Sequence, residues 1–292
     1  MISVIIPNLH SPIIDQVVHS IDYQTSRSKI DEIIVVGQDR YKLVPKHVHF
    51  VDTPQPLCAA AARNLGAHFA QSDYLLFLDA DCIATSDLVS QFLNRHRQGY
   101  AIVGGSVALG SENYWTRCDN IIVFFRALSE TPAGTRRYLP SMNLSILSNL
   151  FFQIGGFDER IREVGEDIDL SLRLRKQGYT LFFEPQAVVY HYQQRISAAH
   201  VWTHLRSFGR AYPGLERNYP GMLTRRINFQ LRTWSGGIIA IAPLLAVWDV
   251  INIYRTTPFL RHYWEMIPGM IWCKTAWYWG VVEGLLALEP GN

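Results

Sequence analysis

Three short runs in the N-terminal part of the chain, in which apolar residues follow one another instead of alternating with polar ones, constrain the fold more than any other feature of the sequence. They cover residues 2–6, 32–36 and 74–78 and are rich in β-branched, leucine and aromatic residues, which is typical of strands buried on both faces of a parallel sheet. Between them, residues 12–24 and the alanine-rich stretch 57–70 have helical spacing. This alternation predicts an α/β fold with a doubly wound, mostly parallel sheet flanked by helices.

Polar residues follow each of these runs directly. They are Pro7-Asn8, Gly37-Gln38-Asp39 and Asp79-Ala80-Asp81. Ligands of an open parallel sheet bind beyond the carboxyl ends of its strands, so we expect these segments to line one site. Two carboxylates one residue apart can share a divalent cation with a ribose or a diphosphate. An Asp-x-Asp tripeptide alone more often caps a helix or forms a turn, and the preceding strand is what favours a ligand site here.

An acidic pair, Glu166-Asp167, opens a second candidate segment. A helical stretch runs from Asp167 to Gln177 and is followed by Gly178. An acid at a helix start commonly caps the helix, and for the pair alone this structural role is the more frequent one. The alternative is a general base, because a second acid nearby disfavours ionisation of a carboxyl group. Glu166 and Asp167 are therefore the candidate catalytic residues.

Two further side chains are candidates for the same site. His191 follows the apolar stretch Val188-Val189-Tyr190. A histidine among aromatic residues is more often a hydrogen-bonded core residue, but imidazole also binds manganese well beside carboxylates. Arg63 lies in the helical stretch 57–70, where it is either an ordinary surface charge or a bidentate partner of a diphosphate.

Taken in order, these segments resemble those of the family 2 glycosyltransferases with the GT-A fold, over residues 2–195. The matching segments are Val4-Ile5-Ile6-Pro7-Asn8, Glu32-Ile33-Ile34-Val35-Val36, Ala62-Arg63-Asn64-Leu65-Gly66, Leu76-Phe77-Leu78-Asp79-Ala80-Asp81, Gly155-Gly156-Phe157-Asp158-Glu159 and Glu166-Asp167-Ile168-Asp169-Leu170. The family implies that Asp79 and Asp81 hold the nucleotide and its divalent metal, Mn²⁺ or Mg²⁺, with Asp81 nearer the metal. It also implies that Asp167 is the base and that His191 is a further metal ligand.

The resemblance implies a transferase that moves one sugar from a nucleotide-diphosphate sugar, with a UDP-sugar favoured, to a hydroxyl of a lipid-linked or polysaccharide precursor. Asp167 would deprotonate the acceptor while the metal and Arg63 compensate charge on the leaving diphosphate. One direct displacement inverts the anomeric centre, and no Ser, Cys or Lys occurs in a triad-like context that would support a covalent intermediate.

The sequence departs from the family pattern in three places. Gly37-Gln38-Asp39 stands where two acids and a glycine are usual, so recognition of the base is assigned to Gln38 or Asp39 and the nucleotide stays open. Asn8-Leu9 replaces the usual Tyr after the first Pro. The Q-x-x-R-W signature of processive synthases is missing, because Gln193-Gln194-Arg195 is followed by Ile196; this favours transfer of a single sugar.

The composition of the chain limits the other classes of fold and function that it could have. With 292 residues and 18% charged residues, the chain is long enough for one large core and an appendage, and it is poorer in charge than the roughly 25% of an average soluble domain. A net charge of +2 without a long basic run argues against nucleic acid. Cys58, Cys82, Cys118 and Cys273 have no C-x-x-C spacing, so neither a zinc site nor a disulfide framework is expected.

The C-terminal part differs in composition. Residues 238–248 are uninterruptedly apolar, short of the roughly 20 residues that span a bilayer, and arginines flank them on both sides. We expect residues 1–210 to form the catalytic domain, with halves of about 1–105 and 106–210, and residues 211–292 to form a helical, membrane-associated region. The start of the chain lacks the features of a secretory signal, so the predicted location is the cytoplasmic face of the cell membrane. A helix pair that caps the domain or forms a homo-oligomer is the alternative.

Two other functions compete with glycosyl transfer. A sugar-phosphate nucleotidyltransferase shares this kind of sheet, but Pro7-Asn8-Leu9-His10-Ser11 lacks the Gly-rich, basic loop that cradles a triphosphate. A catalytically inactive relative that binds nucleotide sugar or acts as a scaffold is the other. The presence of both acidic segments and His191 favours an active enzyme.

Overall fold

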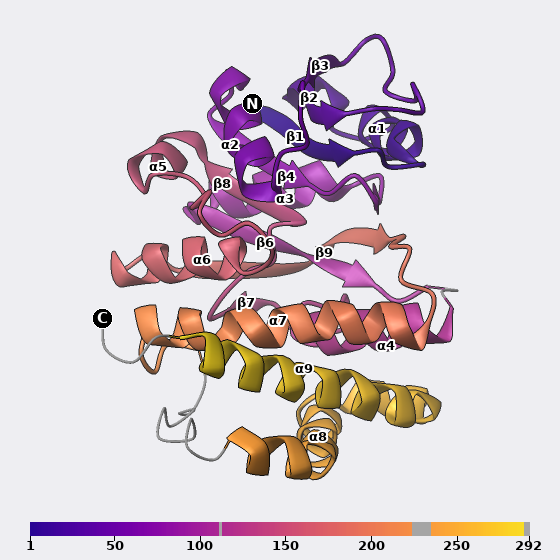
Figure 1. Cartoon of the computed structure of the whole chain (residues 1–292). Helices are drawn as coiled ribbons and strands as arrows, with labels where there is room; N and C mark the ends of the chain where they lie inside the picture. The colour runs from indigo at the N-terminus through magenta and orange to yellow at the C-terminus, as the bar shows by residue number, and fades with distance from the viewer. Residues whose placement is uncertain (111–112, 224–234, 289–292) are drawn as a thin grey trace. The chain divides into compact units, whose positions relative to one another are not determined.

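The structure is a computed structural model that describes residues 1–110, 113–223 and 235–288 (Figure 1). Its contacts divide the chain into two compact units. The first, which we call the sheet unit, contains Met1–Ala108 and Ala127–Tyr192, and the second, the helical unit, contains Leu109–Arg126 and Gln193–Asn292. The catalytic domain predicted for residues 1–210 stays a prediction, and each unit is described by itself below.

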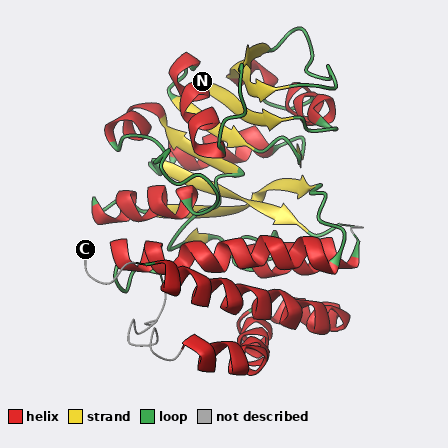
Figure 2. Cartoon of the chain, in the orientation of Figure 1, coloured by secondary structure: helices red, strands yellow, loops and turns green. Residues whose placement is uncertain are grey.

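The sheet unit begins with the predicted alternation of strands and helices. Its first elements are β1 (Ile2–Leu9), α1 (Ile14–Asp22), η1 (Arg27–Lys29), β2 (Ile30–Gln38), β3 (His49–Asp52), α2 (Ala59–Phe69) and β4 (Tyr74–Leu78). β1 pairs in parallel with β2 and β4, and β2 pairs in parallel with β3. Helices flank the sheet (Figure 2), so the predicted α/β fold class is confirmed.

The second half of the sheet is mixed in direction. Its elements are β5 (Cys82–Ala84), α3 (Leu88–Arg97), β6 (Ile102–Ala108), β7 (Gly134–Thr135), β8 (Asn143–Leu147), α5 (Ser148–Gln153), α6 (Glu166–Lys176) and β9 (Leu181–His191). The spatial order is β3-β2-β1-β4-β8-β6-β9-β5, with β7 also beside β9. β8 runs antiparallel to β4 and β6, and β5 runs antiparallel to β9. The short strand β5 therefore brings the residues after Asp81 beside the end of β9.

The core of the sheet unit explains why these runs are rich in apolar residues. Ile5, Ile34 and Phe77 are fully buried, as expected for strands covered on both faces, and burial of each such side chain is worth about 1.5–3 kcal/mol. At the end of β2 the backbone needs a glycine. Gly37 has φ +132°, and a Cβ there would lie 2.0 Å from the carbonyl oxygen of Asn8, so this approach of β1 to β2 excludes any side chain.

The helical unit consists of α4 (Tyr114–Phe124), α7 (Ala198–Asn218), α8 (Ser235–Thr256), η3 (Pro258–Met266) and α9 (Ile267–Ala287). α7 and α9 pack closely, since a Cβ on Gly280 would lie 1.9 Å from the carbonyl oxygen of Arg206. Asp119 of α4 is buried and accepts hydrogen bonds from Arg195 Nε (2.9 Å) and from His204 Nδ1 (2.8 Å). Burial would raise the pKa of Asp119, but these two partners lower it below its usual value.

α8 is longer than the apolar run suggested. The helix continues through Pro243, and its segment Gly237–Thr256 is long and apolar enough to cross a membrane by length and composition alone. Within this segment 28% of the most apolar window is buried. One face of α8, with Ala242, Ala246 and Val250, is buried in the unit, and most of the helix is not.

Candidate active site

The Asp79-Ala80-Asp81 segment forms the turn between β4 and β5, at the carboxyl end of the parallel strands. The backbone N–H of Asp79 donates to Met142 O (3.1 Å) and that of Cys82 donates to Asp79 O (3.0 Å). Ala80 is buried, and its carbonyl accepts a hydrogen bond from the Ser11 hydroxyl. The carboxylates of Asp79 and Asp81 stay about one-third exposed, so both can be reached from the solvent.

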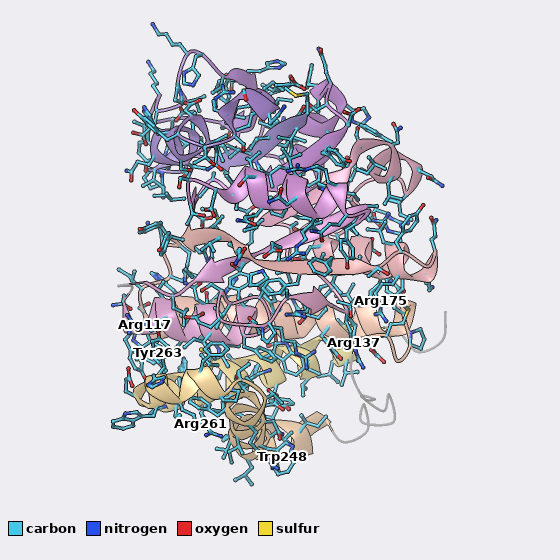
Figure 3. The ribbon with its side chains drawn as sticks, turned by 180° about the vertical axis from the view of Figure 1, so that it is seen from behind. Arg117, Arg137, Arg175, Trp248, Arg261 and Tyr263 are labelled. Carbon is cyan, nitrogen blue, oxygen red and sulfur yellow. The ribbon has the colours of Figure 1, made fainter. Side chains whose placement is uncertain are left out.

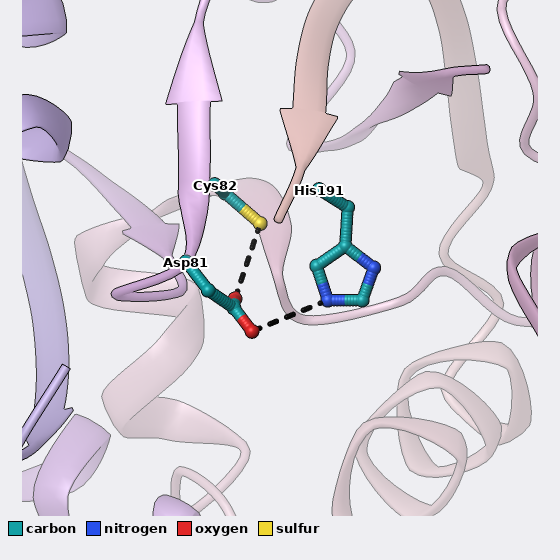
Figure 4. A group of neighbouring side chains, drawn as sticks. All are labelled: Asp81, Cys82 and His191. Carbon is teal, nitrogen blue, oxygen red and sulfur yellow. Dashed lines mark hydrogen bonds and ion pairs between the residues drawn. The ribbon is translucent and has the colours of Figure 1, made fainter. Parts of the chain in front are cut away.

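His191 joins Asp81 through the pairing of β5 with β9. Cys82 and His191 are register partners, and His191 Nε2 lies 3.4 Å from Asp81 Oδ2, while Cys82 Sγ lies 3.7 Å from Asp81 Oδ1 (Figure 4). One ligand atom from each of the three residues lies within 4.8 Å of the others. A carboxylate and an imidazole at this separation suit a divalent cation, and Asp79 lies outside this group of three.

Arg63 connects the two acidic segments. It is buried, not at the surface, and its Nη2 donates to Asp79 Oδ1 (2.6 Å) while its Nη1 donates to Glu166 Oε1 (2.8 Å). Burial would lower the pKa of Arg63, but the two carboxylates more than offset this and raise it. The guanidinium is thus permanently charged, and two of its nitrogens are bound to protein carboxylates. A direct contact with a diphosphate stays a prediction.

Glu166 and Asp167 occupy the first turn of α6, where the helix dipole favours acids. Asp167 Oδ1 accepts a hydrogen bond from the N–H of Ile168 (2.7 Å). Burial, and then the charge of Glu166, raise the pKa of Asp167 to about 7. Asp167 is half-buried. A carboxyl group with such a pKa can accept a proton near neutral pH.

Asn64, the neighbour of Arg63, holds the loop that precedes α6. Its side-chain amide donates to the carbonyl of Phe157 (2.9 Å) and to Glu159 Oε1 (2.9 Å), and its oxygen accepts from the N–H of Phe157 (2.9 Å). Gly156 has φ +63°, and a Cβ there would lie 2.7 Å from Asn64 Oδ1. This small residue allows the loop to approach α2, which fixes the direction in which the chain enters α6.

The residues expected to bind the nucleotide base are held by internal contacts. Asn8 is buried and donates to Gln38 O (3.0 Å), Gln38 Nε2 donates to Thr53 O (3.1 Å), and Asp39 Oδ2 accepts from the N–H of Val44 (2.7 Å). Pro7, Gln38 and Asp39 are half-buried. All of them lie at the ends of β1 and β2, as expected, and their contact with a base stays a prediction.

Cys82 is the residue of this site that the sequence reasoning missed. Its thiol is buried, and burial together with the charges of Asp81 and Asp79 raises the pKa of the thiol well above its usual value. Its one signal in the sequence is its position directly after Asp81. The C-x-x-C spacing does not include a cysteine that strand pairing brings beside a histidine 109 residues later.

Comparison with known proteins identifies the family. A family model described as "Glycosyltransferase like family 2" matches residues 21–225. The chain belongs to this family. The match covers α2, the Asp79-Ala80-Asp81 turn, α6 and His191, so it includes the two acidic segments that the site brings together.

Two curated family relatives from Mycobacterium tuberculosis are similar to parts of the chain. A pre-mycofactocin glycosyltransferase is 30% identical over 144 residues, which are 45% of this chain and 29% of that protein. An N-acetylglucosaminyl-diphospho-decaprenol L-rhamnosyltransferase is 37% identical over 83 residues, which are 27% of this chain and 26% of that protein. The chain therefore spans less than a third of the length of these glycosyltransferases.

A solved structure supports the fold. A crystal structure of GalNAc-T7 with UDP, GalNAc and Mn²⁺ superposes with a TM-score of 0.56 at 16% sequence identity, and the match covers 74% of this chain and 51% of that chain. At this identity the likeness is one of fold, and it confirms the GT-A type of the predicted architecture.

Proposed function

We propose that this family 2 glycosyltransferase is a metal-dependent, inverting enzyme. It moves one sugar from a nucleotide-diphosphate sugar, with UDP-sugars favoured, to a hydroxyl of a lipid-linked or glycan acceptor. The observation that carries this proposal is the Asp81–His191 pair, 3.4 Å apart at the carboxyl end of the sheet. UDP and Mn²⁺ in the GalNAc-T7 crystal and the decaprenol-linked name of one relative support the choice of donor, metal and acceptor class.

The residues of the sheet unit have distinct roles in this proposal. Asp81 and His191, together with the more distant Asp79, would hold Mn²⁺ or Mg²⁺. Bound there, the cation supplies positive charge where the leaving diphosphate becomes more negative. Arg63 orients Asp79 and Glu166 through its two hydrogen bonds. Asp167 removes the proton of the attacking hydroxyl, so that the acceptor oxygen bonds to the anomeric carbon as the diphosphate leaves.

A panel of nucleotide sugars tests this function. We expect at least one donor to release its nucleoside diphosphate in the presence of Mn²⁺ or Mg²⁺ and not in EDTA, and the Asp81→Asn variant to lose this release while staying folded. Metal-independent release, or release that is unchanged in Asp81→Asn, would contradict the assignment. Thermal stabilisation by each donor is the parallel readout, because specific binding raises the apparent stability.

We further propose that the helical unit attaches the enzyme to the cytoplasmic face of an anionic membrane. One face of α8 carries exposed large apolar side chains at intervals of three and four residues, namely Ile241, Leu244, Trp248 and Ile251. Such spacing forms a single apolar stripe along a helix. Trp248 lies at the surface of this unit, as does Arg261 of η3 (Figure 3).

Positive charge lies beside this apolar stripe. A groove of about 270 Å³ in the helical unit has apolar walls that include Val250, Ile267 and Ile271, and Arg255 and Arg261 also line it. Arginine side chains and tryptophan rings both favour the headgroup layer of a bilayer. An apolar stripe flanked by cations therefore fits an interfacial position on anionic lipid better than it fits a neutral partner.

Flotation with liposomes tests the membrane proposal. The full-length protein should float with anionic vesicles at low salt and less with neutral vesicles. The double variant Leu244→Glu/Trp248→Glu should bind about tenfold more weakly or worse, because it removes two apolar side chains from the lipid. Tyr23→Glu is the control, since Tyr23 is at least as exposed as Leu244 and Trp248 but lies at the C-terminal cap of α1 in the sheet unit. A protein that stays soluble with anionic vesicles, and that sediments as a dimer protected at α8, would contradict the proposal.

A further inference from the structure

The cation site contains a sulfur atom that neither the family match nor the relatives assign. Cys82 follows Asp81 directly, is fully buried and faces His191 across the β5–β9 ladder. Its Sγ lies 3.7 Å from Asp81 Oδ1, and ligand atoms of all three residues lie within 4.8 Å of one another. Carboxylate, thiol and imidazole thus converge on one point of the sheet unit (Figure 4).

Two of the separations between these side chains are close to the edges of a tetrahedral metal site. With Zn–O and Zn–N bonds of about 2.0 Å and a Zn–S bond of about 2.3 Å, the edges of a tetrahedron are roughly 3.3 Å between O and N and roughly 3.5 Å between S and O. The observed distances are 3.4 Å between Asp81 Oδ2 and His191 Nε2 and 3.7 Å between Cys82 Sγ and Asp81 Oδ1, so the imidazole and the thiol contact different oxygens of the carboxylate. One ligand atom from each residue lies within 4.8 Å of the others, so the three side chains would move closer together around a bound metal.

The donor set also discriminates between metals. Mg²⁺ prefers oxygen ligands in an octahedron, whereas thiolate sulfur and imidazole suit Zn²⁺, which also binds N, O and S sites more tightly than Mn²⁺ does. Three protein ligands with a fourth position open is the pattern of zinc sites that bind water or substrate. Coordination by sulfur requires the thiolate, so the thiol proton leaves to the buffer as the metal enters.

We infer that Cys82 is a third protein ligand beside Asp81 and His191, and that this site selects Zn²⁺ and other thiophilic dications over Mg²⁺. The inference shares two ligands with the proposed function, but it concerns which metal binds and not whether sugar is transferred. The open fourth position would accept an oxygen atom of a diphosphate. Zn²⁺ and Mn²⁺ would then compete for one site.

X-ray absorption on the Zn²⁺-loaded, full-length protein tests the inference without any substitution. We expect one sulfur at about 2.3 Å from the metal and nitrogen or oxygen neighbours at about 2.0–2.1 Å. A shell of nitrogen and oxygen alone would overturn the inference. Donor turnover measured on the same protein with Mn²⁺ separates this failure from a failure of the proposed function, because a sulfur-free site in an active enzyme refutes only the role of Cys82.

Cadmium provides a second readout that follows the sulfur directly. Titration of metal-free protein with Cd²⁺ should produce one thiolate-to-cadmium ultraviolet absorption band per chain, displaced by Zn²⁺ at similar concentration and by Mg²⁺ not at all. Cys82→Ser should lose the band and bind Zn²⁺ at least about tenfold more weakly. Cys58→Ser, which removes a half-exposed thiol of the same unit, should keep the absorption band and the Zn²⁺ affinity. A band that persists in Cys82→Ser would overturn the inference.

Discussion

Replacement of Asp167 by asparagine is expected to lower sugar transfer by about 10²–10⁴-fold while donor binding stays close to that of the parent protein. Asp167→Asn is nearly isosteric and removes only basicity. Its Oδ1 can still accept the hydrogen bond from the N–H of Ile168, so the first turn of α6 should persist. Steady-state turnover and donor affinity, measured on the same preparation, separate the two effects.

The pH dependence gives this prediction a second test. Burial and the charge of Glu166 raise the pKa of Asp167 to about 7, and a base must be deprotonated to act. Turnover should therefore increase with pH up to about 7 and then level off, and the variant should lose this dependence. Asp169→Asn makes the same change on a carboxylate of the same turn that is bound to Arg173 Nε (2.8 Å), and its folded fraction should turn over normally. Parent-like turnover in Asp167→Asn would mean that another group is the base.

Replacement of Arg63 by methionine is expected to destabilise the sheet unit by about 3–5 kcal/mol, because it leaves buried Glu166 without its cationic partner. The side chain of Glu166 is 11% exposed and that of Asp79 is 30% exposed. Most of the loss of stability should therefore come from the unpaired Glu166 carboxylate. The double variant Arg63→Met/Glu166→Gln should recover part of the loss. All eight tryptophans lie outside the sheet unit, so hydrogen exchange of β1 and β4, not fluorescence, is the measurement of choice.

Arg160→Met is the matched control for the Arg63 prediction. Arg160 pairs with Asp158 at 2.7 Å, but its side chain is 91% exposed, and exposed ion pairs are worth only about 0–1 kcal/mol. Similar small losses in both variants would show that the buried network around Arg63 does not stabilise this unit.

The parallel half of the sheet could be predicted because its signals are local. The runs that form β1, β2 and β4 are mostly apolar, and the residues directly after them fall at the carboxyl ends of the strands. Only the resemblance to a family predicts that Asp81 and His191 lie at the same metal site. The sequence itself gives no sign that a residue of β5 will face a residue of β9.

The remaining features of the fold and the site could not be predicted, because most of them depend on interactions between residues far apart in the sequence. β5 has three residues, too few for any periodicity to appear. The partners of Arg63 lie 16 and 103 residues away, and an arginine in an alanine-rich helix has no local mark of burial. Pro243 is a helix breaker by local rules, yet α8 continues through it.

The stereochemistry of donor turnover tests the central claim most directly. A donor identified by its metal-dependent cleavage is incubated with the enzyme, and the anomeric proton of the first-formed sugar product is followed by NMR before mutarotation. We predict that the product has the anomeric configuration opposite to that of the donor, that it forms only with a divalent cation, and that Asp167→Asn slows its appearance. A product that retains the donor configuration, or one that forms equally well in EDTA, would contradict the account.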